Sequence, residues 1–207
     1  PLGGTPGYPG GGKSIVTTIS PLTGAPIDSN VGGYFGPYKK FSGFDIIQIN
    51  EKADKDTVIF IDGIEKTIKL FEPDGLPQDS YALSRDLTHH FDPDKPVNVS
   101  VVTAGPGAEN TFFGCLNFSW WDAGRKMVRY KQAGRGGIGT VLADKRVKAV
   151  VARFGAVSMK TNAPFDLDGL KKVTKAHARE IHDLDPKQNR MALVGTTHIV
   201  PIMNDHD

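Results

Sequence analysis

The sequence predicts an α+β fold. Segments of strand type fill most of the first 154 residues, and they do not alternate with helices in a βαβ rhythm. The one long amphipathic helical pattern follows them, over residues 166–186. Strands and helices that are separated along the chain favour α+β over a doubly wound parallel sheet.

The first half of the chain contains three segments of strand type. Residues 14–20 are rich in β-branched side chains, and residues 44–50 (FDIIQIN) form a second predicted strand. The segment between them, 21–40, is dense in Pro, Gly, Asp and Asn and reads as turns. Residues 57–71 contain two alternating runs on either side of Asp62-Gly63, which predicts a β-hairpin.

The second half continues with mixed elements. A helix is predicted over 77–91, capped by Asp79 or Ser80, and a buried strand over 97–105. A second hairpin is predicted to turn between Asp122 and Gly124. A helix of about two turns then precedes a strand over 147–154. In the long helix one stripe is apolar and Pro186 ends the pattern; its members are Leu167, Leu170, Val173, Ala176 and Ile181.

Composition limits the function classes. The 25 basic residues are interspersed with 23 acidic ones, so we expect neither a nucleic-acid nor a membrane partner. No apolar run approaches the ~18 residues of a membrane span, and a cytoplasmic location is expected. Cys115 is the single cysteine, which excludes an internal disulfide and a cluster held by cysteines of this chain.

The segment KQAGRGGIGT (131–140) matches the dinucleotide pattern G-x-G-x-x-G through Gly134, Gly136 and Gly139. A Rossmann loop also needs a full crossover helix and an acidic residue about 20 positions later, and both are missing here. The glycines then serve either a tight turn with close packing or another anion. Lys131 and Arg135 favour the anion, as would N–H groups at the start of the following helix.

A second glycine-rich segment, 20–45, follows the basic residue Lys13. Two such loops, each with a cation, would suit two phosphates of one large ligand. The alternative is a pair of structural Ω-loops.

Four motifs together carry a family resemblance. PLGGTP (1–6), the segment 20–45, GPGAEN (105–110) and AGRGGIGTVLADKRVKAVV (133–151) resemble, in order and spacing, the N-terminal domain of the tungsten-containing aldehyde ferredoxin oxidoreductase family. The tail, 192–205, is similar to the passage into that family's second domain. The resemblance implies a saddle of two mixed β-sheets with a few short helices over residues 1–157. It implies that the helical segment 158–207 begins a second, helical domain.

The resemblance also implies a tungsten bis-pyranopterin cofactor whose phosphates are held by both loops and bridged by magnesium. The implied magnesium ligands are the carbonyls of Asn30 and Gln132. The implied cofactor-binding residues are Lys13, Asn30, Gly32, Lys131, Gln132 and Gly134. Lys13 and Lys131 stand where the family usually has arginine, and a lysine binds phosphate as a point charge rather than as a bidentate fork.

By resemblance, the whole enzyme oxidises an aldehyde to a carboxylic acid and passes electrons to ferredoxin or an electron-transfer subunit. A 4Fe-4S cluster and the catalytic residues would lie in further domains beyond this chain, and a homodimer is left open. Two alternatives remain: a related aromatic acyl-CoA ring reductase, and a scaffold module without metal.

Two further features have plain interpretations. His177 and His182 are five positions apart on the predicted helix, whereas ligands on one helix face are three or four apart, so no histidine metal site is predicted. Trp120 and Trp121 are expected to point to opposite faces of a strand, one into the core and one into solvent.

Overall fold

The computed structural model describes residues 3–5, 8–72, 74–155, 164–188 and 190–206. The chain divides into two compact units, one of residues 1–6 and 10–162 and one of residues 7–9 and 163–207. The predicted boundary between residues 157 and 158 falls outside the described ranges.

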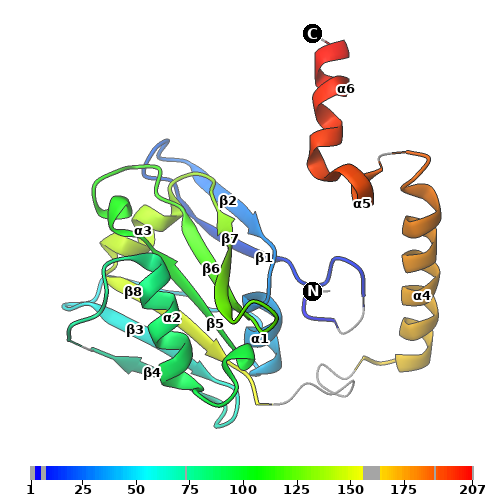
Figure 1. The fold of residues 1–207 in the computed structure, drawn as a ribbon. Helices are drawn as coiled ribbons and strands as arrows, with labels where there is room; N and C mark the ends of the chain where they lie inside the picture. The colour runs from blue at the N-terminus through cyan, green and yellow to red at the C-terminus, as the bar shows by residue number, and fades with distance from the viewer. Residues whose placement is uncertain (1–2, 6–7, 73, 156–163, 189, 207) are drawn as a thin grey trace. The chain divides into compact units, whose positions relative to one another are not determined.

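The larger unit is built on a six-stranded mixed sheet of order β4-β3-β8-β5-β6-β7 (Figure 1). Its strands pair antiparallel except for β3 and β8, which run parallel. The strands are β3 (Thr57–Asp62), β4 (Thr67–Phe71), β5 (Val99–Ala104), β6 (Leu116–Asp122), β7 (Met127–Ala133) and β8 (Val147–Arg153).

Helices cover both faces of this sheet. Helix α2 (Ser80–Phe91) packs on one face, where Leu83 and Leu87 meet Val99 and Val101. Helices α1 (Phe35–Phe41) and α3 (Ile138–Asp144) pack on the other face. Because successive strand residues point to opposite faces, strands buried on both sides are mainly apolar. The six residues of β3 are accordingly all buried.

Strands β1 (Ser14–Ile19) and β2 (Pro26–Val31) form a second, two-stranded antiparallel sheet. Val31 belongs to the core under α1 and α3, and Val16 and Ile27 pack against it. The predicted two-sheet α+β architecture is therefore confirmed, with the mixed pairing confined to the larger sheet.

Several local predictions are confirmed. Both hairpins form, α2 is capped by the Asp79 carboxylate, and β5 and β8 lie within the predicted strands. The strand predicted over residues 44–50 is wrong, because this segment pairs with no strand. Its apolar residues Phe44, Ile47 and Ile49 instead pack on the core from an irregular chain. The segment 21–40 is more regular than predicted, since it contains β2 and α1.

The smaller unit contains α4 (Leu167–Leu184), α5 (Met191–Val194) and α6 (Ile199–Asp205). Helix α4 lies within the predicted range 166–186, and the Asp166 carboxylate accepts from the Gly169 N–H at its start. Val173 and Ile181 of the predicted stripe are exposed. Across the described residues, no helix combines the length and apolar character that a membrane crossing requires.

A largely buried ion pair fixes the end of β3 to the end of β8. Arg153 Nη2 lies 2.8 Å from Asp62 Oδ2, and Arg153 Nη1 donates to the Phe91 carbonyl at 2.9 Å. Burial raises the pKa of Asp62, but hydrogen bonds from Arg153 and from the N–H groups of Glu65 and Ile64 outweigh it. The net result is a lowered pKa, so the carboxylate is the form that the fold stabilises.

Asp62→Asn is expected to destabilise the larger unit by roughly 2–3 kcal/mol at pH 7, because Arg153 loses its charged partner. Since the folded pKa lies below the unfolded value of about 3.9, the contribution is present above that pH and disappears as pH falls through the folded pKa. Urea unfolding of the full-length protein at pH 7 and at lower pH should show the difference between variant and wild type shrinking. Asp144→Asn, in the exposed pair with Lys52, is the matched control and should change little.

Candidate functional site

The two glycine-rich loops lie beside each other on the larger unit. A Cβ built on Gly12 would lie 3.3 Å from the Gly33 carbonyl oxygen, and one built on Gly33 would lie 3.7 Å from Lys131 Cγ. The Arg135 N–H donates to the Ser29 hydroxyl at 3.3 Å. Segments more than 100 positions apart in sequence therefore form one surface, with Lys13, Gly33 and Lys131 along it.

The six predicted cofactor residues are all at least partly exposed. Lys13, Asn30, Lys131, Gln132 and Gly134 are exposed, and Gly32 is half-buried. Asn30 lies in β2, opposite Ile15 of β1, and Gln132 lies in β7, opposite Asn117 of β6. Both side chains bond to neighbours: Asn30 Nδ2 to Asp28 Oδ2 at 3.4 Å, and Gln132 Nε2 to Asn117 Oδ1 at 3.4 Å.

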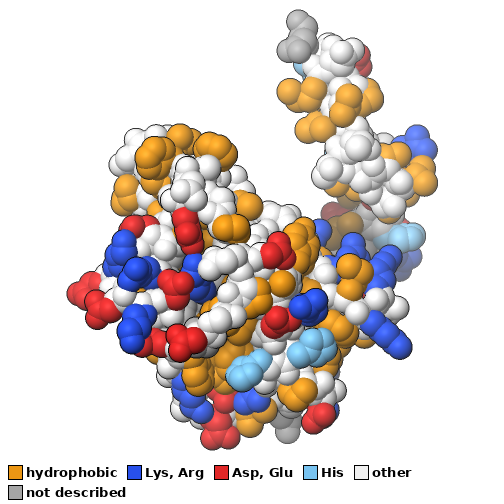
Figure 2. Space-filling view, turned by 60° about the vertical axis from the view of Figure 1, so that its left-hand side comes forward, with side chains coloured by type: hydrophobic (Ala, Val, Ile, Leu, Met, Phe, Trp, Pro, Cys, Tyr) orange, Lys and Arg blue, Asp and Glu red, His pale blue; other side chains and the backbone are white. Residues whose placement is uncertain are grey.

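Lys13, Lys131 and Arg135 bring positive charge to the exposed surface of the larger unit. Among the described residues, no acidic side chain forms an ion pair with Lys13, Lys131 or Arg135. Lys148 behaves differently, because it lies between Asp56 at 3.4 Å and Glu109 at 2.8 Å. On the face shown in Figure 2, basic and acidic side chains are interspersed. Unpaired cations beside open glycines suit an anionic ligand.

The glycines of the second loop divide into two groups. A Cβ on Gly134 would meet nothing within 4 Å. A Cβ on Gly136 would lie 2.4 Å from Ile27 Cγ1, one on Gly137 2.0 Å from the Phe112 carbonyl oxygen, and one on Gly139 2.2 Å from the Cys115 carbonyl oxygen. The later glycines therefore serve close packing, and only Gly134 offers open space.

The start of α3 is a packing contact. Gly137 has φ +73° at the N-cap, and the Gly139 N–H donates to the Gly114 carbonyl at 2.8 Å. The prediction that this helix offers its first N–H groups to an anion is therefore wrong at Gly139. The exposed basic side chains of the segment, Lys131 and Arg135, lie before the helix.

A cavity of about 730 Å³ adjoins both loops. Gly33 and Lys131 line it, and so do Tyr34, Trp120 and Arg129. The remaining lining residues are Tyr38, Val97, Trp121, Asp122 and Ala123. The sequence analysis did not identify Tyr34 or Arg129; Tyr34 is the N-cap residue of α1, and Arg129 lies two positions before Lys131 on β7.

The expectation of one core tryptophan and one exposed tryptophan is wrong. Both rings are half-buried, and both line the cavity. Their directions do alternate: Trp120 lies 6.0 Å from the Tyr34 ring near α1, whereas Trp121 lies 4.9 Å from the His89 ring on α2. Because a helix covers each face of the sheet here, neither ring reaches bulk solvent fully.

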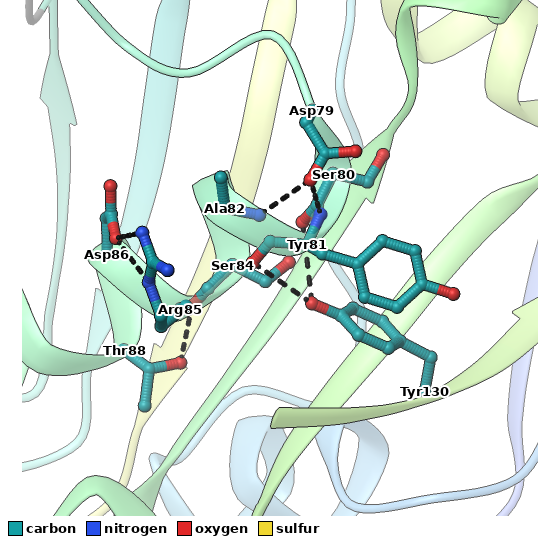
Figure 3. Close-up of polar contacts among 9 residues, drawn as sticks. All are labelled: Asp79, Ser80, Tyr81, Ala82, Ser84, Arg85, Asp86, Thr88 and Tyr130. Atoms are coloured by element: carbon teal, nitrogen blue, oxygen red, sulfur yellow. Dashed lines mark hydrogen bonds and ion pairs between the residues drawn. The ribbon is translucent and has the colours of Figure 1, made fainter. Parts of the chain in front are cut away.

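Helix α2 contacts β7 through Tyr130, on the face of the sheet opposite to Lys131, as Figure 3 shows for Tyr130. The Tyr130 hydroxyl approaches the carbonyl oxygens of Tyr81 at 3.3 Å and Ser80 at 3.5 Å. Burial raises the pKa of Tyr130 to about 12, so the phenol stays protonated and can donate. Asn117 links the Ser80 hydroxyl, at 3.4 Å, to Gln132. Gln132 is thus tied through β6 to the first turn of α2.

The histidines within the described part of the chain do not gather with other ligand-type side chains into a metal site. Within the described ranges, no group of three or more His, Cys, Asp or Glu side chains is arranged to hold a metal ion.

Comparison with known proteins gives a family match. Residues 1–154 match the family model described as aldehyde ferredoxin oxidoreductase, N-terminal domain. The whole chain is similar to the tungsten-containing aldehyde ferredoxin oxidoreductase of Pyrococcus horikoshii, at 29% identity over 208 residues, and covers 31% of that relative. It is also similar to the glyceraldehyde-3-phosphate:ferredoxin oxidoreductase of Pyrococcus furiosus, at 29% identity, over 84% of this chain and 29% of the relative.

A solved structure shares the fold. The active-site complex BamBC of benzoyl coenzyme A reductase, solved with 1,5-dienoyl-CoA, aligns with a TM-score of 0.59 and 25% identity. The alignment covers 73% of this chain and 21% of that chain. By comparison, the chain spans about a third of the length of the curated relatives it matches.

Proposed function

The chain belongs to the aldehyde ferredoxin oxidoreductase family, through the N-terminal domain that residues 1–154 match, and from this premise we propose that it forms the cofactor-binding base of a tungsten bis-pyranopterin oxidoreductase. The observation that carries the proposal is the meeting of the two loops. Lys13, Gly33 and Lys131 lie along one accessible surface with no acidic ion-pair partner for either lysine among the described residues.

We assign the phosphates of the cofactor to this surface. Lys13 and Lys131 supply one positive charge from each loop, and phosphate oxygens accept from ammonium groups in charge-assisted hydrogen bonds. The open space at Gly32 and Gly134 fits close approach of a ligand to the main chain. The packed glycines after Gly134 hold the loop in place, so the surface is preorganised before the ligand binds.

We propose that the main-chain carbonyls of Asn30 and Gln132 would hold a magnesium ion that binds together with the cofactor. Their side chains already bond to Asp28 and Asn117, which supports a role for the main chain instead. Magnesium prefers oxygen ligands and commonly shares them with phosphates. Binding of magnesium by the main-chain carbonyl of residue 132 does not depend on its side chain, so a glutamine at this position is compatible with the proposal.

The bound tungstopterin would supply the redox chemistry, and the residues of this chain would position it and neutralise its phosphates. We propose that the whole protein oxidises an aldehyde to a carboxylic acid and transfers two electrons to ferredoxin or an iron–sulfur partner. A 4Fe-4S cluster and the catalytic acid–base groups would come from the remaining domains of the enzyme. The fold shared with benzoyl coenzyme A reductase supports a second candidate, the reduction of an aromatic acyl-CoA ring.

Metal and pterin analysis of the full-length protein tests this proposal. We expect about one tungsten and two pterins per polypeptide, the pterins detected by fluorescence after oxidation. Protein that is folded but lacks tungsten, molybdenum and pterin would instead be a scaffold module without metal. Assays with an aldehyde and with an aromatic acyl-CoA then separate the two enzyme candidates.

A further inference from the structure

The cavity beside Lys131 contains an arginine, Arg129, that is not among the cofactor residues implied by the family resemblance. Arg129 lines it, and no other guanidinium is among the lining residues described. Lys13 and Lys131 each present an ammonium group, which binds a phosphate without fixing its orientation. A guanidinium presents parallel N–H donors that match two phosphate oxygens at once.

The alternation of side chains along β7 places Arg129 on the same face as Lys131. Both residues lie on β7, two positions apart, so their side chains leave the same face of the sheet roughly 7 Å apart along the strand. Trp120 lies directly opposite Arg129, and Phe118 lies directly opposite Lys131. One anion in the cavity is therefore within reach of both basic side chains.

The guanidinium of Arg129 is held in place from two sides. Its Cζ atom lies 5.6 Å from the centre of the Trp120 ring, and its Nη1 donates to Asp122 Oδ2 at 3.3 Å. A guanidinium has five N–H donors, so this contact leaves donors for a ligand. Arg129 keeps 46% of its side chain exposed, while Asp122 is only 16% exposed.

Asp122 does not cancel the charge of Arg129. Its carboxylate also contacts Arg125 Nη1 at 3.0 Å, so one negative charge is shared by two guanidinium groups. The Arg125 N–H and guanidinium, together with Arg129, hold the pKa of Asp122 below its usual value. The cluster therefore keeps a net positive charge that faces the cavity through Arg129.

We propose that Arg129, held by Trp120 and Asp122, makes the bidentate contact with a cofactor phosphate that the lysines at positions 13 and 131 cannot make. The inference rests on the proposed function, since it assigns a further residue to the same phosphate site. Arg129 then orients one phosphate, and Lys131 adds charge from the same strand. Arg125 lies outside the cavity lining and has no such role.

Three variants of the full-length protein test this assignment: Arg129→Ala, Arg129→Lys and Arg125→Ala. Tungsten and pterin are measured per polypeptide after purification, with circular dichroism as a measure of folding. Loss of a charged, bidentate contact is expected to lower the content of both about tenfold in Arg129→Ala. Arg129→Lys should restore only part of the content, because it keeps the charge and loses the fork.

Arg125→Ala leaves Asp122 to pair with Arg129 alone, so the content should fall less than in Arg129→Ala, because the guanidinium of Arg129 stays in the cavity. Full content in Arg129→Ala or in Arg129→Lys would overturn the inference, and so would an equal loss in Arg125→Ala. If Arg129→Ala does not fold, Arg129→Lys decides the question alone. These outcomes are distinct from failure of the proposed function, in which wild-type protein itself contains no tungsten, molybdenum or pterin.

Discussion

Replacing Lys13 and Lys131 together by alanine is expected to lower the tungsten and pterin content of the full-length protein at least about tenfold. The two lysines bring one charge from each loop to the same surface, and among the described residues neither has an acidic partner. Because both side chains are exposed, their removal should leave the free energy of unfolding of the protein without cofactor within about 0.5 kcal/mol of wild type.

The matched control is Lys52→Ala with Lys55→Ala. These lysines are also exposed, their removal changes the net charge equally, and they pair with Asp144 and Glu72 away from the cavity lining. Cofactor content should be unchanged in the control. Wild-type content in the Lys13 and Lys131 variant would contradict the phosphate assignment, whatever the activity of the enzyme.

Gly137→Ala is expected to have the largest effect on stability, more than about 3 kcal/mol. The residue has φ +73°, and an added Cβ would lie 2.0 Å from the Phe112 carbonyl oxygen, which belongs to the main chain and cannot rotate away. Left-handed backbone alone costs an alanine about 1–2 kcal/mol. Thermal unfolding of full-length Gly137→Ala should show a markedly lower transition temperature or poor recovery of folded protein.

Gly134→Ala is the counterpart, three positions earlier in the same loop. A Cβ there meets nothing within 4 Å, so stability should stay within about 0.5 kcal/mol of wild type. A large destabilisation by Gly134→Ala, or none by Gly137→Ala, would contradict the division between open and packed glycines. A loss of cofactor in Gly134→Ala without a loss of stability would agree with a ligand close to this position.

Local patterns predicted those elements that depend on nearby residues. The turn at Asp62-Gly63 and the Asp79 cap depend on contacts within a few positions, and both hairpins and α2 were found where expected. The strand prediction for residues 44–50 was wrong because their apolar residues pack on the core without a neighbouring strand to pair with. Strand β2 was missed because its polar sequence, PIDSNV, is ordered by pairing with β1.

The candidate site was also predicted in part from the sequence and in part only from the folded structure. The two loops and their lysines are visible in the sequence as glycine-rich segments with basic neighbours, and the family resemblance supplies the individual cofactor residues. Sequence alone does not show which glycines are packed, because Phe112 and Cys115 approach them only in the folded chain. Arg129 and Tyr34 were also not identified from the sequence; they line the cavity from β7 and from the start of α1.

The position of β8 determines when the large sheet can form during synthesis. This strand lies between β3 and β5, yet it is the last of the six to emerge from the ribosome. Until then the β3–β4 hairpin and the β5–β6–β7 ribbon have no strand to join them, and each leaves an apolar edge unpaired. Joining them requires closure of a loop of more than 80 residues between β3 and β8, which slows folding. The two unpaired edges therefore stay open to aggregation until residues 147–153 have emerged from the ribosome.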